Sequence, residues 1–233
     1  MPDNLSMRRY VRGMKPDMSR RSQPSLSDSA RSHQGRPTAA LPAAQALLTF
    51  SKTHDIALYA MYGEIFSAWA NGRINETNAG LDQLREAVAD FLALGNKNAA
   101  PTFYGLVGDL EARRGHMDCA LRSFNLALLI AEENGEHWTD SMLLRRKGEI
   151  LLNRDSSNVT AAEEALRAAI AVAKRQDARS YKLVASLSLA RLYQSIDRPI
   201  EAHDLLASAL DGFSTTPEMP EIAEAQALRE RLA

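Results

Sequence analysis

Hydrophobic and polar positions divide this chain into two parts. From Leu41 onward, alanine- and leucine-rich segments of 12 to 20 residues are separated by short polar breaks, namely NGRIN, LGNKN, ENGE, RDSSN and IDRP. No run of alternating β-branched residues is present, so the pattern predicts helices and no strands. Residues 1–37 are rich in Ser, Arg and Pro and lack periodicity. This predicts a disordered tail followed by an all-α body over residues 38–233.

The helical segments repeat with a period near 40 residues. In each predicted second helix, a small residue is followed four positions later by a large one, and three positions after that by alanine. In chain order these columns are Gly80, Ala120, Ala162 and Ala202; Leu84, Phe124, Leu166 and Leu206; and Ala87, Ala127, Ala169 and Ala209. A fourth column, in the preceding helices, is Ala68, Gly108, Gly148 and Ala190. Such self-similarity is typical of stacked helical hairpins.

The spacing resembles the tetratricopeptide signature, and residues 108–127 fit it without a gap. The repeat is longer than the usual 34 residues, and Glu111 and Asn71 stand where an aromatic residue is common. We expect an all-α, tetratricopeptide-like solenoid of about four hairpins, with a half-repeat over residues 41–53 before them and a cap helix over residues 219–232. Glycine inside a helix costs about 1 kcal/mol relative to alanine. Gly148 is therefore expected to let the two helices of its hairpin approach closely, while the large column fills the gap to the next hairpin.

Local signals mark where these helices begin and end. Gly95 and Gly135 follow second helices and suit the left-handed residue after a helix. Pro101 suits a first helical turn, and Thr160 with Glu163 has the spacing of a capping box. Trp138 is expected to pack at the entrance of its helix.

The C-terminal hundred residues carry a more specific resemblance. The segments GEHWTDSMLLRRKGEILL (residues 135–152), AIAVAKRQDARSYKLVASLSLARLYQ (residues 169–194) and EAHDLL (residues 201–206) resemble the tail of large bacterial proteins. Those proteins join a class III adenylate/guanylate cyclase or regulator domain to an AAA/STAND-type ATPase and a tetratricopeptide-like region. The resemblance covers roughly residues 41–233. It implies a sensor or scaffold tail, without the residues that perform the family's catalysis.

Candidate catalytic and cofactor residues do not form a recognisable site in the sequence. No phosphate-binding G-x4-G-K-S/T loop occurs, and the histidines lack metal-ligand spacing. His116 and Cys119 are better explained as a turn histidine beside a buried cysteine. Glu163 and Glu164 are adjacent on a helix, diverge in direction and suit a helix start. We expect no enzyme activity, no catalytic residue, no cofactor, no metal and no small-molecule substrate.

Charge and cysteine content bound the partners and the compartment. The chain has a formal net charge of −1, but residues 1–36 carry +5 and the remainder −6. The basic tail could contact nucleic acid or anionic lipid, but a leader without such a role fits its composition better. Cys119 is the single cysteine, and no apolar run approaches a membrane span. We therefore expect a cytoplasmic protein that does not bind a membrane, with nucleic acid an improbable ligand.

The first helices of the hairpins supply the candidate binding residues, because they line the concave groove in tetratricopeptide-like stacks. Arginines there alternate with aromatic and amide groups, which suits an acidic or extended peptide. The alternative is that these residues form a solvated face, with Trp69 packing between hairpins. Arg145 is expected to point into the groove, and Arg146 and Lys147 to diverge from it by roughly 100° per residue. The predicted groove residues are Tyr62, Trp69, Arg73, Thr102, Asp109, Arg113, Arg145, Glu149, Asn153, Arg191 and Gln194.

Three functions remain open from the sequence. The first is a non-catalytic protein–protein interaction module that serves a signalling cyclase/ATPase system and binds a protein or peptide partner in its groove. The second is a fragment of an adenylate cyclase or STAND-type ATPase. The third is the tail of a transcriptional regulator, although no helix-turn-helix domain is visible.

Overall fold

The computed structural model describes residues 37–213 and 219–232, which form ten α-helices, one 3₁₀ helix and no strand. This confirms the predicted all-α class. The predicted disordered tail lies outside the described residues except for Pro37, where the first described helix begins. In chain order the helices are α3 Pro37–Thr53, α4 Ala57–Asn75, α5 Asn78–Ala93, α6 Ala100–Arg113, α7 Met117–Asn134, η1 His137–Thr139, α8 Asp140–Arg154, α9 Val159–Arg175, α10 Arg179–Ser195, α11 Pro199–Leu210 and α12 Pro220–Leu232.

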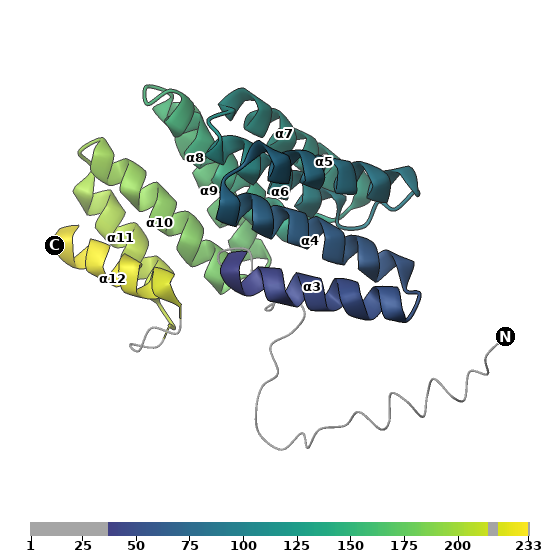
Figure 1. Cartoon of the computed structure of the whole chain (residues 1–233). Coiled ribbons are helices and arrows are strands. Elements are labelled where there is room, and N and C mark those ends of the chain that lie inside the picture. Colours follow the sequence, from purple (N-terminus) through teal and green to yellow (C-terminus); the bar gives the residue numbers. More distant parts are fainter. Residues whose placement is uncertain (1–36, 214–218, 233) are drawn as a thin grey trace, which may run out of the picture. The chain divides into compact units, whose positions relative to one another are not determined.

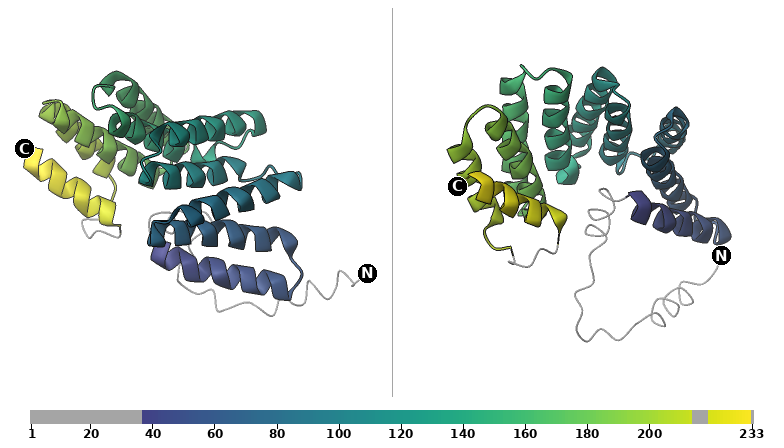
Figure 2. Two further views of the ribbon diagram at one scale, coloured as in Figure 1. Left: turned by 45° about the horizontal axis from the view of Figure 1, so that its top comes forward. Right: turned by 60° about the vertical axis from the view of Figure 1, so that its left-hand side comes forward.

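These helices pair into hairpins that lie side by side (Figures 1 and 2). The hairpins are α4–α5, α6–α7, α8–α9 and α10–α11; α3 packs on α4, and α12 packs on α10 and α11. The first helices α4, α6, α8 and α10 also contact one another in sequence. Each second helix packs on the first helix of the next hairpin. The first helices therefore form one layer and the second helices another. We call the exposed side of the layer of first helices the first-helix face.

The column of small residues sets the distance between the two helices of a hairpin. A Cβ added to Gly148 would lie 2.8 Å from the Leu166 Cγ and 3.1 Å from the Ala162 carbonyl oxygen. One added to Gly108 would lie 2.8 Å from the Phe124 ring. The prediction of close approach is therefore confirmed. Phe124 and Leu166, of the column of large residues, contact the small residue of their own hairpin. The prediction that this column fills the gap to the next hairpin was therefore incomplete.

Helix ends agree with the sequence signals at three positions and differ at one. Gly95 and Gly135 have φ values of 76° and 68°, and Pro101 lies in the first turn of α6. The capping box was wrong, because α9 begins after Asn158 and no side chain caps it. The Glu163 carboxylate instead accepts a 2.8 Å hydrogen bond from the Tyr193 hydroxyl and pairs with Arg198 at 3.1 Å. These tertiary partners replace the local cap.

Glu111 explains one departure from the tetratricopeptide pattern. The residue is 4% exposed, and its carboxylate pairs with Arg85 of α5 at 2.8 Å and accepts a 2.6 Å hydrogen bond from the Ser123 hydroxyl of α7. The same offset of 26 residues joins Arg167 to the Tyr193 hydroxyl at 2.8 Å in the last two hairpins. In these two repeats the aromatic position thus links a first helix to the preceding second helix, through an aromatic hydroxyl in one and a carboxylate in the other.

The GEHW stretch, between α7 and α8, is tied to the start of α6. Glu136 accepts hydrogen bonds of 2.8 and 3.0 Å from the Ala99 amide, at the start of α6. The Trp138 indole donates to the same carboxylate at 3.1 Å and stays 40% exposed. Trp138 thus lies at the entrance of α8 as predicted, but its side chain is exposed there and not packed as expected. Its ring position is set by the polar indole nitrogen, which holds Glu136 on α6.

Both ends of the described stack match the predicted elements. The half-repeat forms α3, which begins at Pro37 and so extends four residues before the predicted start at Leu41. The cap forms α12, whose Ile222, Ala225 and Leu228 are buried in the same hydrophobic cluster as the last hairpin. Glu224 and Glu230 are exposed and leave a charged outer side, as a terminal helix of a repeat stack requires.

Candidate partner-binding face

The first-helix face is built around Asp109, near the C-terminal end of α6. One carboxylate oxygen pairs with Arg73 of α4 at 2.7 Å and the other with Arg146 of α8 at 2.7 Å. Arg113, one turn further along α6, reaches the same carboxylate at 3.7 Å. Asp109 is only 14% exposed. A single carboxylate therefore joins three successive first helices and is shared by three guanidinium groups.

Glu149 continues this arrangement on α8. Its carboxylate pairs with Arg146 at 2.6 Å and with Arg145, and it accepts a 2.7 Å hydrogen bond from the Ser188 hydroxyl of α10. The ion pairs thus run from α4 through α6 to α8, and the Ser188 hydrogen bond extends the contacts to α10. We call this set of residues the charge network; its members are Arg73, Asp109, Arg113, Arg145, Arg146, Glu149 and Ser188.

The electrostatics of the network follow from its geometry. Burial raises the pKa of Asp109, but the guanidinium groups of Arg146, Arg73 and Arg113 outweigh it and hold that pKa below its ordinary value. The pKa of Glu149 is lowered in the same way, against burial, by Arg145 and Arg146. The pKa of Arg113 is lowered, chiefly by burial and then by the like charges of Arg73 and Arg146, against the attraction of Asp109.

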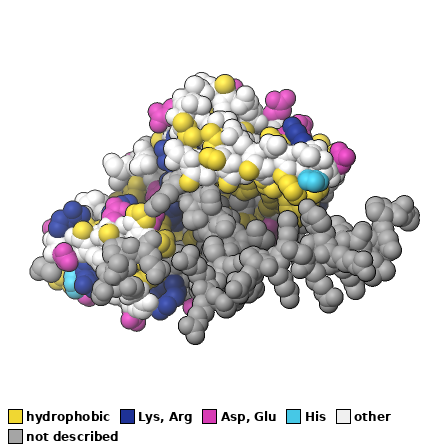
Figure 3. Space-filling view, turned by 60° about the horizontal axis from the view of Figure 1, so that its bottom comes forward, with side chains coloured by type: hydrophobic (Ala, Val, Ile, Leu, Met, Phe, Trp, Pro, Cys, Tyr) yellow, Lys and Arg dark blue, Asp and Glu magenta, His cyan; other side chains and the backbone are white. Residues whose placement is uncertain are grey.

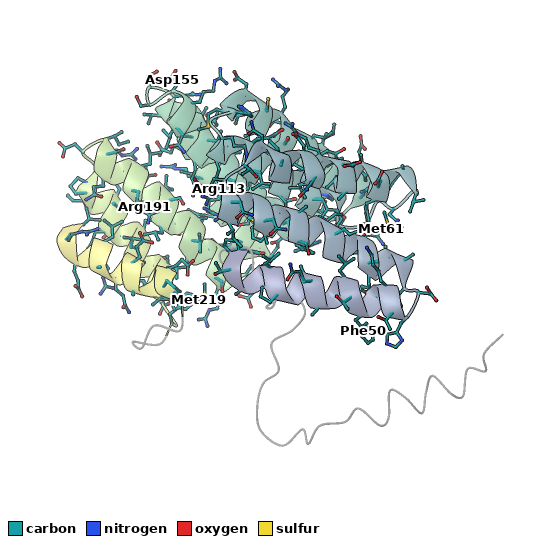
Figure 4. All side chains as sticks on the ribbon, in the orientation of Figure 1. Phe50, Met61, Arg113, Asp155, Arg191 and Met219 are labelled. Atoms are coloured by element: carbon teal, nitrogen blue, oxygen red, sulfur yellow. The ribbon has the colours of Figure 1, made fainter. Side chains whose placement is uncertain are left out.

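Four predicted groove residues are exposed on the first helices. They are Arg113, Asn153, Arg191 and Gln194. The side chain of Arg113 is 42% exposed and that of Arg191 is 50% exposed, although Arg191 also pairs with Glu224 of α12. Figure 4 labels both arginines on the ribbon. These side chains are the polar groups that a partner could reach.

Three other predicted residues belong to the core in whole or part. Trp69 and Thr102 are each 2% exposed, so neither offers a surface to a partner. Arg73 lies over the Trp69 ring, 5.5 Å from its centroid, which leaves Trp69 a packing residue beneath the network. Tyr62 is half-buried and makes edge-on contacts with Phe91 and Phe103, at 5.6 and 5.3 Å between ring centroids.

The sequence analysis missed two members of the network. Arg146 was expected to diverge from the face, yet its long side chain reaches Asp109 and Glu149. Helical direction alone is a poor guide for arginine, whose guanidinium lies several bonds from the backbone. Ser188 carried no signal, because a serine among alanines and leucines reads as a neutral helix position. The pairing of Arg145 and Glu149 could have been found from their four-residue spacing.

The described residues contain no group of three or more His, Cys, Asp or Glu side chains arranged to hold a metal ion. Cys119 is partly exposed rather than buried, which corrects the expectation for that residue. None of the helices in the described ranges is long and apolar enough to cross a membrane. On the face drawn in Figure 3, acidic and basic side chains are interspersed over its coloured part.

Comparisons with known proteins give structural neighbours only. No family model and no curated protein matches the chain. The crystal structure of BtubC (BKLC) from P. vanneervenii is similar with a TM-score of 0.67 and 18% identity, over 84% of this chain and 83% of that one. A putative kinesin light chain from Podosopora anserina, with nearly identical TPR-like repeats, gives 0.52 and 16%, over 91% and 100%. Yeast Tom70 gives 0.59 and 17%, over 96% of this chain and 45% of that one.

These neighbours agree with the architecture built from the sequence. At such low identity they show the fold alone, and that fold is a tetratricopeptide-like α-solenoid. Repeat stacks of this kind present preformed extended surfaces rather than a closed pocket.

Proposed function

We propose that this protein is a non-catalytic interaction module that binds a protein or peptide partner along its first-helix face. The observation that carries the proposal is the row of accessible polar side chains, Arg113, Asn153, Arg191 and Gln194, on contiguous first helices. The charge network, to which Arg113 also belongs, joins these first helices before a partner arrives. A preformed surface reduces the ordering cost of binding.

The cellular context of the partner is a finer part of the proposal. The resemblance of residues 135–152 and 169–194 to the tails of cyclase/ATPase proteins favours a regulatory domain of such a signalling system. Within the structure, Gly135, Glu136, Trp138 and Gly148 of that motif serve helix ends, hairpin contacts and close packing. The motif is thus compatible with a scaffold role. Binding of labelled ATP to the purified chain would instead support the fragment-of-an-ATPase alternative.

The test compares partner capture by two surface variants of the full chain. The first-helix variant carries Arg113→Ser, Asn153→Ala and Gln194→Ala; the second-helix control carries Leu126→Ser, Leu129→Ser and Ile200→Ser, all exposed on α7 and α11. Partners identified by mass spectrometry with the wild-type chain are then measured against both variants. We expect the first-helix variant to bind at least tenfold more weakly and the control to bind normally.

Two outcomes would contradict the proposal. One is unchanged binding by the first-helix variant. The other is loss of binding by the second-helix control while its helicity, followed by circular dichroism, is retained. Arg145→Glu is avoided as a test substitution, because a new carboxylate beside Glu149 would disturb the network as well as the surface.

A further inference from the structure

Positive charge exceeds negative charge within the charge network. It contains four arginines and two carboxylates, and three of these arginines share Asp109. The surplus within the network is two positive charges, and exposed Glu76, which also acts on Arg113, reduces it to one. Removing charges from water is costly unless they are paired. The network therefore retains a capacity to accept an additional anion.

Arg113 is the arginine of the network that an additional anion can reach. Its ion pair with Asp109 runs through Nε at 3.7 Å, which is too long for a hydrogen bond. Arg73 and Arg146 both hold Asp109 at 2.7 Å and are only 13% and 24% exposed, against 42% for Arg113. The planar guanidinium group can bind a carboxylate through two parallel N–H donors.

We propose that Arg113 docks a carboxylate of an acidic, extended peptide where α4, α6 and α8 meet. The proposal rests on the function proposed above and names the chemistry of its partner. A nucleic acid fits less well, because it requires several phosphate contacts and the accessible surplus lies at one guanidinium, on which the carboxylates of Asp109 and Glu76 also act. An extended peptide places a single side chain at this junction and leaves its backbone for the amide groups of Asn153 and Gln194.

The probe is a fluorescein-labelled ten-residue peptide of alternating glutamate and glycine, read by fluorescence anisotropy with the full chain. Its controls are the same peptide with glutamine for glutamate, and a labelled ten-nucleotide single-stranded DNA. We expect the glutamate peptide to bind and both controls to bind at least tenfold more weakly. Binding should weaken as salt rises, because exposed charges are screened.

The variants separate docking at Arg113 from general attraction. Arg113→Ala should weaken binding of the glutamate peptide about tenfold, the usual scale for losing a charge-assisted bidentate contact. Arg122→Ala removes the same charge from the exposed side of the second helix α7 and should change binding less than twofold. Asp109→Asn, where it folds, should tighten binding severalfold, because the competing carboxylate is gone.

Equal loss in Arg113→Ala and Arg122→Ala, or tighter binding of DNA than of the peptide, would overturn the inference. No binding of the glutamate peptide would also overturn it. If the glutamate peptide does not bind but the first-helix variant still loses its captured partner, the proposed function is supported. Only the inference that the partner is acidic is then contradicted.

Discussion

At the scale of single residues, the question posed by the sequence was why a glycine stands inside the helix that contains Arg145 and Arg146. Glycine is needed at position 148 for packing, because Leu166 and the Ala162 carbonyl occupy the space a side chain would need. The arginines before it belong to a different feature, the charge network. One short stretch thus serves hairpin packing on one side and inter-hairpin ion pairs on the other.

Gly148→Ala tests the packing role. Alanine gains about 1 kcal/mol in helix propensity, but overpacking against the Ala162 backbone and Leu166 costs typically 1–3 kcal/mol. We expect a net loss of roughly 1 kcal/mol in the free energy of unfolding, measured with urea. Asn153→Ala, at an exposed position of the same helix, should be neutral or slightly stabilising. A stabilised Gly148→Ala chain would contradict the assignment.

Asp109 provides a prediction about pH. Its folded-state pKa is lowered relative to an unfolded value of about 3.9. Its stabilising contribution is therefore present above the unfolded pKa and is lost as the pH falls through the folded pKa. Asp109→Asn should cost roughly 3 kcal/mol at pH 7, because three guanidinium groups lose their shared partner.

The check is urea unfolding of wild type and Asp109→Asn at pH 7 and at steps from pH 5 down to pH 2. The difference between the two chains should be largest at neutral pH and should narrow as Asp109 becomes protonated in the wild type. Glu149 titrates in both chains, so its contribution largely cancels. A difference that stays constant down to pH 2 would show that the Asp109 charge is unimportant.

At the scale of helices, a polar link ties the segment that follows α7 to the start of α6. Glu136→Ala removes the acceptor of the Ala99 amide and of the Trp138 indole. We expect a loss of about 1 kcal/mol in the free energy of unfolding, similar to the loss of a helix cap. Glu133→Ala, an exposed acid on the preceding α7, is the matched control and should change stability by less than half as much. Equal effects would mean that the link to α6 contributes nothing.

The helices were predictable because packing imposes a period. The small and large columns, the glycines at helix ends and the half-repeat all follow from local spacing, and the described helices agree with them. The capping box and the packing of Trp138 were not predictable in this way. Both failed because Glu163 and Glu136 bond to groups distant in sequence, Tyr193 of α10 and the Ala99 amide before α6, which no local pattern records.

At the scale of the whole described stack, the binding face was predicted only in part. The first-helix position of Arg113, Arg191 and Gln194 follows from the repeat register, and their exposure agrees with it. Burial of Thr102 and the reach of Arg146 depend on how neighbouring hairpins meet, which a single sequence does not specify. Use of the face by a partner remains a prediction.

Hydrogen exchange of the full chain, alone and with its captured partner, tests the central claim most directly. The account predicts slower exchange along the first helices, concentrated at the C-terminal end of α6 and in α8 and α10. The second helices α5, α7, α9 and α11 should be unchanged. Slower exchange confined to those second helices would place the partner on the opposite layer and contradict the proposed binding face.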